Sequence, residues 1–498
     1  MGEDVTHRKF TRGDRARFRA KAQDCLDALT TMLADGAFEP GEPQLGMEVE
    51  LNLVDEHMQP AMANAEVLTA IADPDFQTEL GQFNIEINVA PRPFPRDETL
   101  SLEQDLRASL NAADAKAREQ GSQLVMVGML PTLRQEHFHS QWLSKNPRYD
   151  LLNEQIFAAR GEDIELDIEG VAMPGAARPE RLRVSTDTIL PEAACTSVQL
   201  HLQVEPDAFA AHWNAAQCLS GVQVALAANS PFLAETALWH ESRVPVFEQA
   251  TDTRSPELRI QGVRPRVWFG ERWITSIFDL FEENARYFPA LLPVCSEQDP
   301  QAELAAGRVP ELHELKMHNG TVYRWNRPVY DTVNGEPHLR IENRVLPAGP
   351  SVLDTMADAA FYYGTLRALA NDERPLWTQM SFDAATENLH AGARDGLGAK
   401  LYWPDAGWMS VSELVLRKLL PLAHEGLIAY GLSQRAIDRY LGVIEGRCVT
   451  GRNGAVWQRE RVAQLQRQGA DRRSALTQML HDYTEGMHAD QAVHTWAL

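Results

Sequence analysis

The chain has 498 residues, of which 44% are hydrophobic and 23% are charged, a composition typical of a globular protein with a large core. Its 47 basic and 70 acidic side chains give a net charge of −23. This charge disfavours a general affinity for nucleic acid or anionic lipid, although an anionic substrate can still enter with metal ions or meet local arginines. We expect no nucleic-acid partner and no association with a membrane.

Hydrophobic periodicity predicts helices and strands in alternation. In chain order, we expect a helix over 14–36, strands over 46–55 and 79–91, a helix over 101–120, strands over 123–129 and 195–204, a helix over 207–228, a strand over 338–347, and helices over 352–371, 411–430, 433–445 and 455–483. The stretch between 240 and 335 is rich in Arg, Trp and Pro, which predicts long loops with short helices. We place a domain boundary near residue 400.

The cysteines and the N-terminal sequence bear on the cellular compartment. The five cysteines are odd in number and show no CxxC spacing, which argues against a disulfide framework and against structural zinc. The N-terminal residues lack the apolar stretch of a secretory signal. These observations predict a reducing, cytoplasmic environment. They leave the oligomeric state open, a homo-oligomer included.

Two early strands carry acids and amides on one face. Side chains two apart in a strand share a face, so in GMEVELNLVD the residues Glu48, Glu50 and Asn52 lie opposite an apolar set. In ELGQFNIEINVAP, Asn84 and Glu86 lie opposite a second apolar set. Neither polar face holds a Lys or an Arg.

Two later strands repeat this alternation with a different polar set. The segment CTSVQLHLQV places Gln199 and His201 on its polar face. The segment HLRIENRVLP places Arg340, Glu342 and Arg344 on its polar face, and the two arginines are the first of the pattern. An antiparallel sheet with one wet face is the ordinary interpretation of any one such strand.

The four strands together indicate more than a wet surface. Carboxylates that face each other on neighbouring strands repel. A hard divalent cation relieves this repulsion, and Mg²⁺ is typically held by carboxylates together with water and substrate phosphates. The sequence therefore predicts a metal–phosphate site on the concave face of a sheet, provided that segments far apart in the chain converge.

Each polar side chain receives a predicted role. The predicted metal ligands are Glu48, Glu50, Glu79, Glu86, His201 and Glu342. We expect Glu48 and Glu50 to bind different ions, and Arg344 to neutralise a phosphoryl group as it transfers. A solvated surface position for each carboxylate, and a packed histidine at position 201, remain the alternatives. No P-loop, GxGxxG, GxSxG or HExxH motif is present, so bound ATP would depend on metal ions and not on a glycine-rich cradle.

These segments together resemble a known family. The quoted strands, with ANSPF at 228–232 and GTVYRWNRP at 320–328, occur in the order found in glutamate–cysteine ligase family 2, over residues 40–370. The resemblance implies an α+β, glutamine-synthetase-like fold, in which a curved antiparallel β-sheet forms a funnel-shaped site with helices on its convex side. This catalytic domain would span 1–400, and 401–498 would be a helical C-terminal extension.

The family's chemistry supplies further expectations. Its members hold two or three Mg²⁺ ions, which Mn²⁺ can replace, and bind ATP at one end of the funnel. They transfer the γ-phosphoryl group to the side-chain carboxylate of glutamate, and an amine then displaces phosphate to form an amide. In the founding enzymes the product is γ-glutamylcysteine, in glutathione biosynthesis. The resemblance thus implies ATP, a glutamate-like acid and an amine such as cysteine as substrates.

The resemblance also carries roles over residue by residue. Glu48 and Glu50 match the paired glutamates of the first strand, and Glu79 and Glu86 match the acidic pair of the second element. Position 201 matches a metal-binding histidine, although the family often shows His-x-His where this chain has Gln-x-His.

The basic side chains receive roles from the resemblance as well. Glu342 and Arg344 match a Glu-x-Arg that combines a metal ligand with a phosphate-contacting arginine, and both are expected to be catalytic. The residues assigned to substrate or ATP binding are Asn84, Gln199, Arg324, Arg327 and Arg340.

Other functions are compatible with the same fold. A guanidino-type phosphotransferase would use a related fold and stop at the phosphorylated product, so an amide product with ADP release would exclude it. A non-catalytic descendant could bind a metabolite in the same funnel, but all six predicted metal positions retain usable side chains. The least specific alternative is an α+β protein whose polar strand faces are exposed to solvent and bind nothing.

Overall fold

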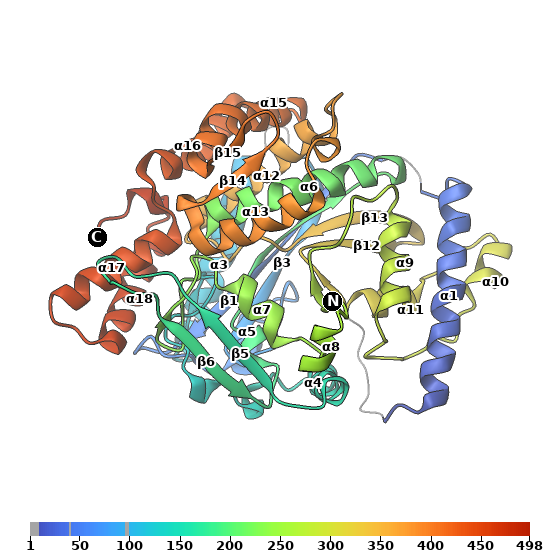
Figure 1. Cartoon of the computed structure of the whole chain (residues 1–498), viewed down its shortest axis with the longest axis horizontal. Coiled ribbons are helices and arrows are strands. Elements are labelled where there is room, and N and C mark those ends of the chain that lie inside the picture. The colour runs from blue at the N-terminus through green and yellow to red at the C-terminus, as the bar shows by residue number, and fades with distance from the viewer. Residues whose placement is uncertain (1–8, 39–40, 95–98) are drawn as a thin grey trace.

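The computed structural model describes residues 9–38, 41–94 and 99–498 (Figure 1). The strands are β1 (Gln44–Val54), β2 (Phe76–Thr78), β3 (Asn84–Pro93), β4 (Gln123–Val125), β5 (Ile164–Glu169), β6 (Arg181–Thr186), β7 (Val198–Gln203), β8 (Phe232–Leu233), β9 (Thr236–Ala237), β10 (Val267–Trp268), β11 (Tyr323–Arg324), β12 (Asn326–Val333), β13 (Glu336–Asn343), β14 (Lys400–Trp403) and β15 (Gly407–Ser410).

The α-helices are distributed along the whole described chain. They are α1 (Arg12–Ala34), α2 (Asn64–Ile71), α3 (Thr99–Glu119), α4 (Pro147–Arg160), α5 (Leu190–Ala193), α6 (Pro206–Ala227), α7 (Arg243–Ala250), α8 (Pro256–Ile260), α9 (Ile277–Tyr287), α10 (Pro300–Ala305), α11 (His313–Asn319), α12 (Val352–Ala370), α13 (Phe382–Asp395), α14 (Val411–Leu414), α15 (Leu420–Ala429), α16 (Gln434–Thr450), α17 (Gly454–Arg467) and α18 (Arg472–His488).

The central feature is a curled sheet of seven strands among the described residues. Its order is β12–β13–β7–β1–β3–β2, and β4 pairs with the end of β1. All of these neighbours are antiparallel. β7 therefore joins strands from the first hundred residues to strands from beyond residue 320 in one sheet, in which the former are the blue arrows and the latter the yellow arrows of Figure 1. The predicted α+β fold with a curved antiparallel sheet is confirmed.

The apolar face of this sheet packs against helices. Val49, Leu51 and Leu200 on its central strands have no exposed surface. Among the helices on this side, α6 and α12 contact each other, and α6 reaches the sheet edge at β12 and β13. Asn343 is polar on this apolar face, and it exchanges amide hydrogen bonds of 3.1 and 3.2 Å with Gln223 of α6. Because the helices occupy this face, the polar face is left to form a site.

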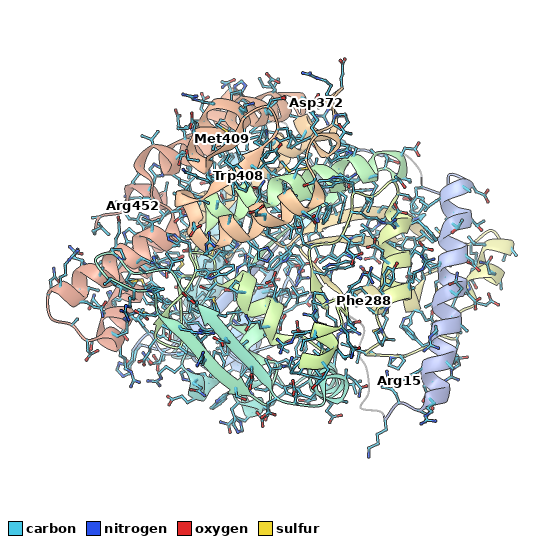
Figure 2. All side chains as sticks on the ribbon, in the orientation of Figure 1. Arg15, Phe288, Asp372, Trp408, Met409 and Arg452 are labelled. Carbon is cyan, nitrogen blue, oxygen red and sulfur yellow. The ribbon has the colours of Figure 1, made fainter. Side chains whose placement is uncertain are left out.

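Local sequence signals position these two helices. The hydroxyl of Ser351 accepts a hydrogen bond from the backbone N–H of Asp354 and begins α12, as an N-cap serine does. α6 begins at Pro206, a residue favoured in the first helical turn. Gly221 lets α13 approach closely, because a Cβ there would lie 2.6 Å from the backbone of Asn388. Side chains fill the space between these layers (Figure 2).

The structure differs from the sequence-based elements in several places, and it adds α13 and the β5–β6 and β14–β15 hairpins, which were not expected. β12 was missed inside the stretch that we expected to be loops; it contains Pro328 and lies at the sheet edge, where a residue without a backbone N–H is tolerated. The strand expected from residue 79 begins only at Asn84, so Glu79 precedes it. The helix expected over 455–483 is two helices, separated around Gly469, whose φ of 102° favours glycine.

The C-terminal helices pack on the rest of the molecule. α15 and α16 both contact α12, and Gly426 of α15 lies so close to Gly364 of α12 that no side chain fits there. The hydrophobic core is continuous between these parts. The boundary near residue 400 stays a prediction. No helix in the described part of the chain is both long and apolar enough to cross a membrane.

Candidate active site

A cavity of about 410 Å³ lies over the polar face of the sheet, with α4, α5, α7, α9 and α11 contributing to its wall. This volume is in the range of ordinary ligand sites. Ten of the twelve side chains assigned from the sequence line it: Glu48, Glu50, Glu79, Asn84, Glu86, Gln199, Arg327, Arg340, Glu342 and Arg344. His201 and Arg324 are the two that do not.

Strand register places the polar side chains next to one another. Glu50 is directly opposite Glu86, and Glu48 is opposite Gln199. On the other side of β7, Glu342 is opposite both His201 and Arg327. The pairings β3–β1, β1–β7 and β7–β13 therefore bring together the four polar strand faces that the metal–phosphate prediction needed in one place.

One end of the cavity concentrates negative charge. Glu86 has 5% of its surface exposed, and burial together with the charge of Glu48 raises its pKa to about 7. Burial and the neighbouring Glu86 carboxyl, to which it is hydrogen-bonded, raise the pKa of Glu79 well above its usual range. Such shifts are expected where carboxylates share a site without a counter-ion.

Glu50 is held rigidly beside this pair. Its carboxylate accepts hydrogen bonds from the backbone N–H of Ser197 at 2.6 Å, from the Ser197 hydroxyl at 3.0 Å and from Gln199 Nε2 at 2.9 Å. Burial nevertheless raises the pKa of Glu50, against the opposing charge of Arg344. The hydrogen bonds fix its orientation, but they do not fully replace a cation.

Glu48 is oriented by His201. The Nε2 atom of His201 lies 3.2 Å from Glu48 Oε1, while its Nδ1 accepts a hydrogen bond from Arg340 Nε at 3.2 Å. Burial alone would raise the pKa of Glu48, but the contact with His201 outweighs it and lowers the pKa. His201 thus points Nε2 at a carboxylate and not into the cavity. In this arrangement it supports a candidate ligand, and direct metal binding by His201 stays a prediction.

The other end of the cavity is basic. Glu342 lies between two guanidinium groups, with Arg344 Nη1 at 2.8 Å from one carboxylate oxygen and Arg327 Nη2 at 2.7 Å from the other. Burial would raise the pKa of Glu342, but these two charges hold it well below its usual range. Burial would lower the pKa of Arg344, and the charges of Glu342 and Glu50 raise it instead. Arg344 therefore stays charged at the cavity wall.

Arg324 lies away from the cavity, unlike the other arginines of the sequence-based site. It is 1% exposed, its Nη2 donates to Glu283 at 3.0 Å and to Asn284 at 3.1 Å, and its guanidinium lies over the Trp268 ring at 4.8 Å. Its neighbours Tyr323 and Trp325 face the cavity, and the alternation of an extended chain turns Arg324 away from it. The structure therefore places Arg324 outside the cavity wall, and its expected contact with substrate stays a prediction without support from this geometry.

Several charged side chains of the cavity wall lie outside the set assigned from the sequence, among them one glutamate, one arginine and one lysine. Glu192 of α5 and Arg148 of α4 line the cavity, as does Lys316 of α11, which lies 2.9 Å from Glu311 and 3.3 Å from Asp331. They lie outside the alternating strands, on the helices α4, α5 and α11. No local pattern distinguishes them from surface charges, so the sequence offers no signal for them.

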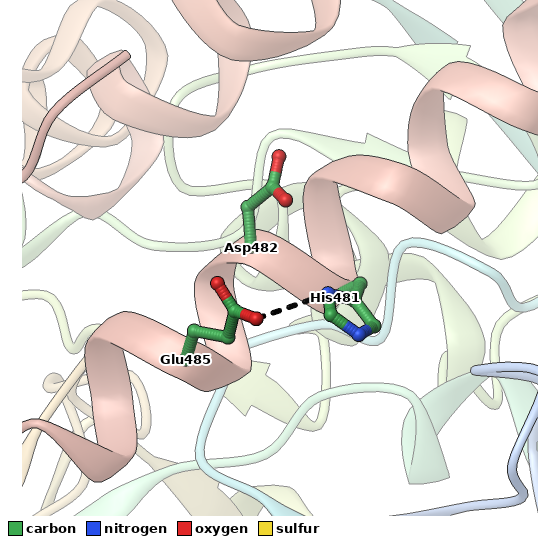
Figure 3. A group of neighbouring side chains, drawn as sticks. All are labelled: His481, Asp482 and Glu485. Atoms are coloured by element: carbon green, nitrogen blue, oxygen red, sulfur yellow. Dashed lines mark ion pairs between the residues drawn. The ribbon is translucent and has the colours of Figure 1, made fainter.

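The oxygen ligands of the cavity fit divalent cations, although no three of its carboxyl groups among the described residues lie close enough together to form a ready-made ligand cluster. Buried carboxylate oxygens beside unpartnered amide oxygens of Asn84 and Gln199 are ligands that Mg²⁺ prefers. Among the described residues, the one set of three acidic, His or Cys side chains with ligand atoms all within 4.8 Å is His481, Asp482 and Glu485 on α18 (Figure 3). That group is largely exposed, so it is an ordinary charged helix surface.

Comparison with known proteins places this cavity in a family. A family model described as glutamate–cysteine ligase family 2 matches residues 44–478. No curated protein matches the sequence. The crystal structure of a glutamate–cysteine ligase from Francisella tularensis in complex with AMP is similar with a TM-score of 0.54 and 12% identity, over 91% of this chain and 90% of that chain.

A second solved structure is similar over part of its length. The bifunctional glutathione synthetase from Pasteurella multocida matches with a TM-score of 0.51 and 9% identity, over 93% of this chain and 55% of that chain. At such identities these likenesses show the fold alone.

The family match reaches past residue 370 into α18, beyond the segment in which the sequence resemblance was found. The chain belongs to glutamate–cysteine ligase family 2.

Proposed function

We propose that this protein is an ATP-dependent carboxylate–amine ligase that activates the side-chain carboxylate of glutamate, or of a similar acid, and joins it to an amine such as cysteine. The observation that carries the proposal is the division of one cavity into an acidic end and a basic end. Glu50, Glu79 and Glu86 lie at the first, and Arg327 and Arg344 at the second. A nucleotide triphosphate with its metal ions needs both.

The proposed reaction has two steps. A carboxylate oxygen of the acid forms a bond to the γ-phosphorus as the bond from that phosphorus to the ADP oxygen breaks, which gives an acyl phosphate. The amine nitrogen then bonds to the acyl carbon, phosphate leaves, and the amide is released. Phosphoryl transfer spreads negative charge over oxygens, and positive charge placed in advance stabilises it. Arg344 is positioned for this role, because it lines the cavity and its ion pair with Glu342, at 2.8 Å, fixes the guanidinium group there.

Divalent ions would be held by the acidic end. The candidate ligands are Glu48, Glu50, Glu79 and Glu86, and bound Mg²⁺ or Mn²⁺ would neutralise the phosphates and withdraw charge from them. The chain itself orients these ligands: Ser197 and Gln199 hold Glu50, and His201 holds Glu48. Glu342 has both oxygens occupied by arginines, so its direct role as a ligand requires one of those pairs to open.

The proposal is tested by following ADP and amide together. Purified protein is incubated with Mg-ATP, glutamate and a panel of amines including cysteine, and products are identified by mass spectrometry. We expect ADP release that depends on the acid, and an amide in equal amount. Glu86→Gln should abolish both, whereas Glu165→Gln, an exposed glutamate on β5, should not. A phosphorylated product without amide would support a phosphotransferase, and ATP binding without turnover would support a binding protein.

A further inference from the structure

One histidine of the sheet lies between an arginine and a candidate metal ligand. His201 of β7 is directly opposite Gly46 of β1, which is two residues before Glu48 and therefore shares its face. A Cβ at Gly46 would lie 3.4 Å from the Cβ of His201 and 3.7 Å from its Cγ. Because Gly46 has no side chain, the imidazole ring can lie against β1 and reach Glu48. His201 is 7% exposed, so its ring is enclosed in this position.

Both ring nitrogens of His201 have a polar neighbour. Nδ1 accepts a hydrogen bond from Arg340 Nε at 3.2 Å, and Nε2 lies 3.2 Å from Glu48 Oε1. The first contact is a well-formed hydrogen bond, whereas the second is a close approach without ideal alignment. A guanidinium group has only donors, so Nδ1 must accept with its lone pair, and the proton of the neutral ring is then on Nε2. The arginine thus selects one tautomer, with its N–H beside the Glu48 carboxylate.

Arg340 is held in turn at the other end of its guanidinium group. Its Nη1 lies 3.3 Å from Asp331 Oδ2 and 3.0 Å from His338 Nε2. The strand register also places it, because Arg340 is opposite Gln203 and is thus a diagonal neighbour of His201 on one face of the β13–β7 pair. Backbone pairing and side-chain contacts therefore both direct Nε of Arg340 at Nδ1.

This arrangement bears on what His201 can bind. A histidine that binds a metal usually donates its other ring N–H to an acceptor such as a carboxylate or a carbonyl. Nδ1 of His201 faces a donor instead, so metal binding through Nε2 would move the proton to Nδ1 and set two N–H groups against each other. With Nε2 protonated, the candidate ligands around Glu48 are oxygen atoms, which suit Mg²⁺ and Mn²⁺.

We propose that Arg340 is a positioning residue that fixes the Nε2–H tautomer of His201, so that His201 orients Glu48 and does not bind the metal itself. The inference rests on the proposed function only in treating Glu48 as a metal ligand. It concerns Nε and Nη1 of Arg340, and a contact between this arginine and substrate stays a separate prediction.

The first test determines the tautomer in the metal-free protein. The whole chain is labelled with ¹⁵N in its histidines, and long-range ¹H–¹⁵N correlation is recorded in EDTA at pH 8, above the ordinary histidine pKa of about 6.5. The signals of His201 are identified by their loss in His201→Gln. We expect the Nε2–H pattern in wild type, in Arg340→Lys, which can still donate, and in the control Arg183→Met, whose arginine on β6 is 69% exposed. Arg340→Met should shift the Nδ1 resonance towards that of a protonated nitrogen.

The second test asks whether the ring binds the metal, and it uses wild type alone. Mn²⁺ is added to the ¹⁵N-histidine protein, and electron spin echo envelope modulation reports any nitrogen bound directly to the ion. We expect no such coupling. Mn²⁺ titration of two variants adds an affinity: His201→Gln, whose amide can donate from near the position of Nε2, should stay within about threefold of wild type, and His201→Asn should bind about tenfold more weakly. A histidine ligand would instead make both variants weak.

The outcomes separate this inference from the proposed function. An Nδ1–H tautomer in wild type would overturn the inference, as would a tautomer that Arg340→Met leaves unchanged, or a strong coupling between Mn²⁺ and a histidine nitrogen. Failure of Mn²⁺ to bind wild type, with the tautomer fixed by Arg340 as expected, would instead reject the metal site of the proposed function alone.

Discussion

Replacement of Glu86 by glutamine should stabilise the metal-free protein while it removes activity. The Glu86 carboxylate is 5% exposed and lies among Glu48, Glu50 and Glu79 without a cation of its own. An ionised carboxylate in this position is a cost to the folded state that only a bound cation relieves. Glutamine has nearly the same shape and no charge, and it can still accept the 3.1 Å hydrogen bond from Asn88 Nδ2.

The magnitude follows from the pKa. In the folded protein the pKa of Glu86 is about 7, against an ordinary value of 4.5. Between these two values the folded chain binds a proton that the unfolded chain has lost, so the free energy of unfolding falls as the pH rises through this window. A difference of about 2.5 in pKa, at about 1.4 kcal/mol each, gives a penalty of about 3 kcal/mol above pH 7. The penalty is absent below pH 4.5.

The assay is urea unfolding in EDTA, followed by tryptophan fluorescence, at a series of pH values from 4.5 to 8. We expect Glu86→Gln to be more stable than wild type by up to about 3 kcal/mol at pH 8 and equal to it near pH 4.5. Added Mg²⁺ should stabilise wild type at pH 8 and act much less on the variant, since a ligand stabilises only the state that binds it. Glu165→Gln, on the surface, should show neither effect.

The reasoning is refuted if Glu86→Gln is less stable than wild type at pH 8, or if the difference between the two proteins does not depend on pH. Either result would mean that the folded protein already compensates the Glu86 charge. An equal effect of Mg²⁺ on both proteins would remove Glu86 from the candidate ligands, whatever the stability result.

Three further substitutions test separate parts of the site. Arg344→Ala should keep the fold and slow phosphoryl transfer by about 3–4 kcal/mol of barrier, measured as kcat for ADP release; near wild-type turnover would remove its role. Glu48→Gln should raise the Mg²⁺ concentration needed for half-maximal rate, and an unchanged Mg²⁺ dependence would count against it as a ligand. Arg324→Ala should lower stability by about 2–3 kcal/mol, because the buried Glu283 loses one of its two arginine partners and keeps only Arg272 at 3.2 Å, while the KM for ATP stays as it was. A change in that KM without loss of stability would restore Arg324 to the substrate site.

Strand alternation made much of the site predictable. The apolar half of each period had to be buried, so the faces that carry Glu48, Glu50, Glu86 and Gln199 were fixed by the sequence as soon as the strands were recognised. The curved sheet and the family could be inferred for the same reason, since the four segments keep their order. Glu79 lines the cavity as expected, although it precedes β3 and is not on that strand. It reaches the cavity because its carboxyl group lies beside that of Glu86.

Tertiary structure alone decided the remainder. Whether Arg324 or Arg327 faces the cavity depends on where β11 ends and β12 begins, and the prolines and aromatic residues there hide the strand from any periodicity. His201 contacts Glu48 because β7 pairs with β1 in one register, and a shift by one residue would have turned its ring to the other face. Glu192 reaches the cavity on a four-residue helix, which is too short to leave a pattern in the sequence. The sequence determines which side chains each strand places on the polar face. The helices and loops that form the rest of the cavity wall are positioned by contacts with residues hundreds of positions away, so the sequence pattern alone does not predict them.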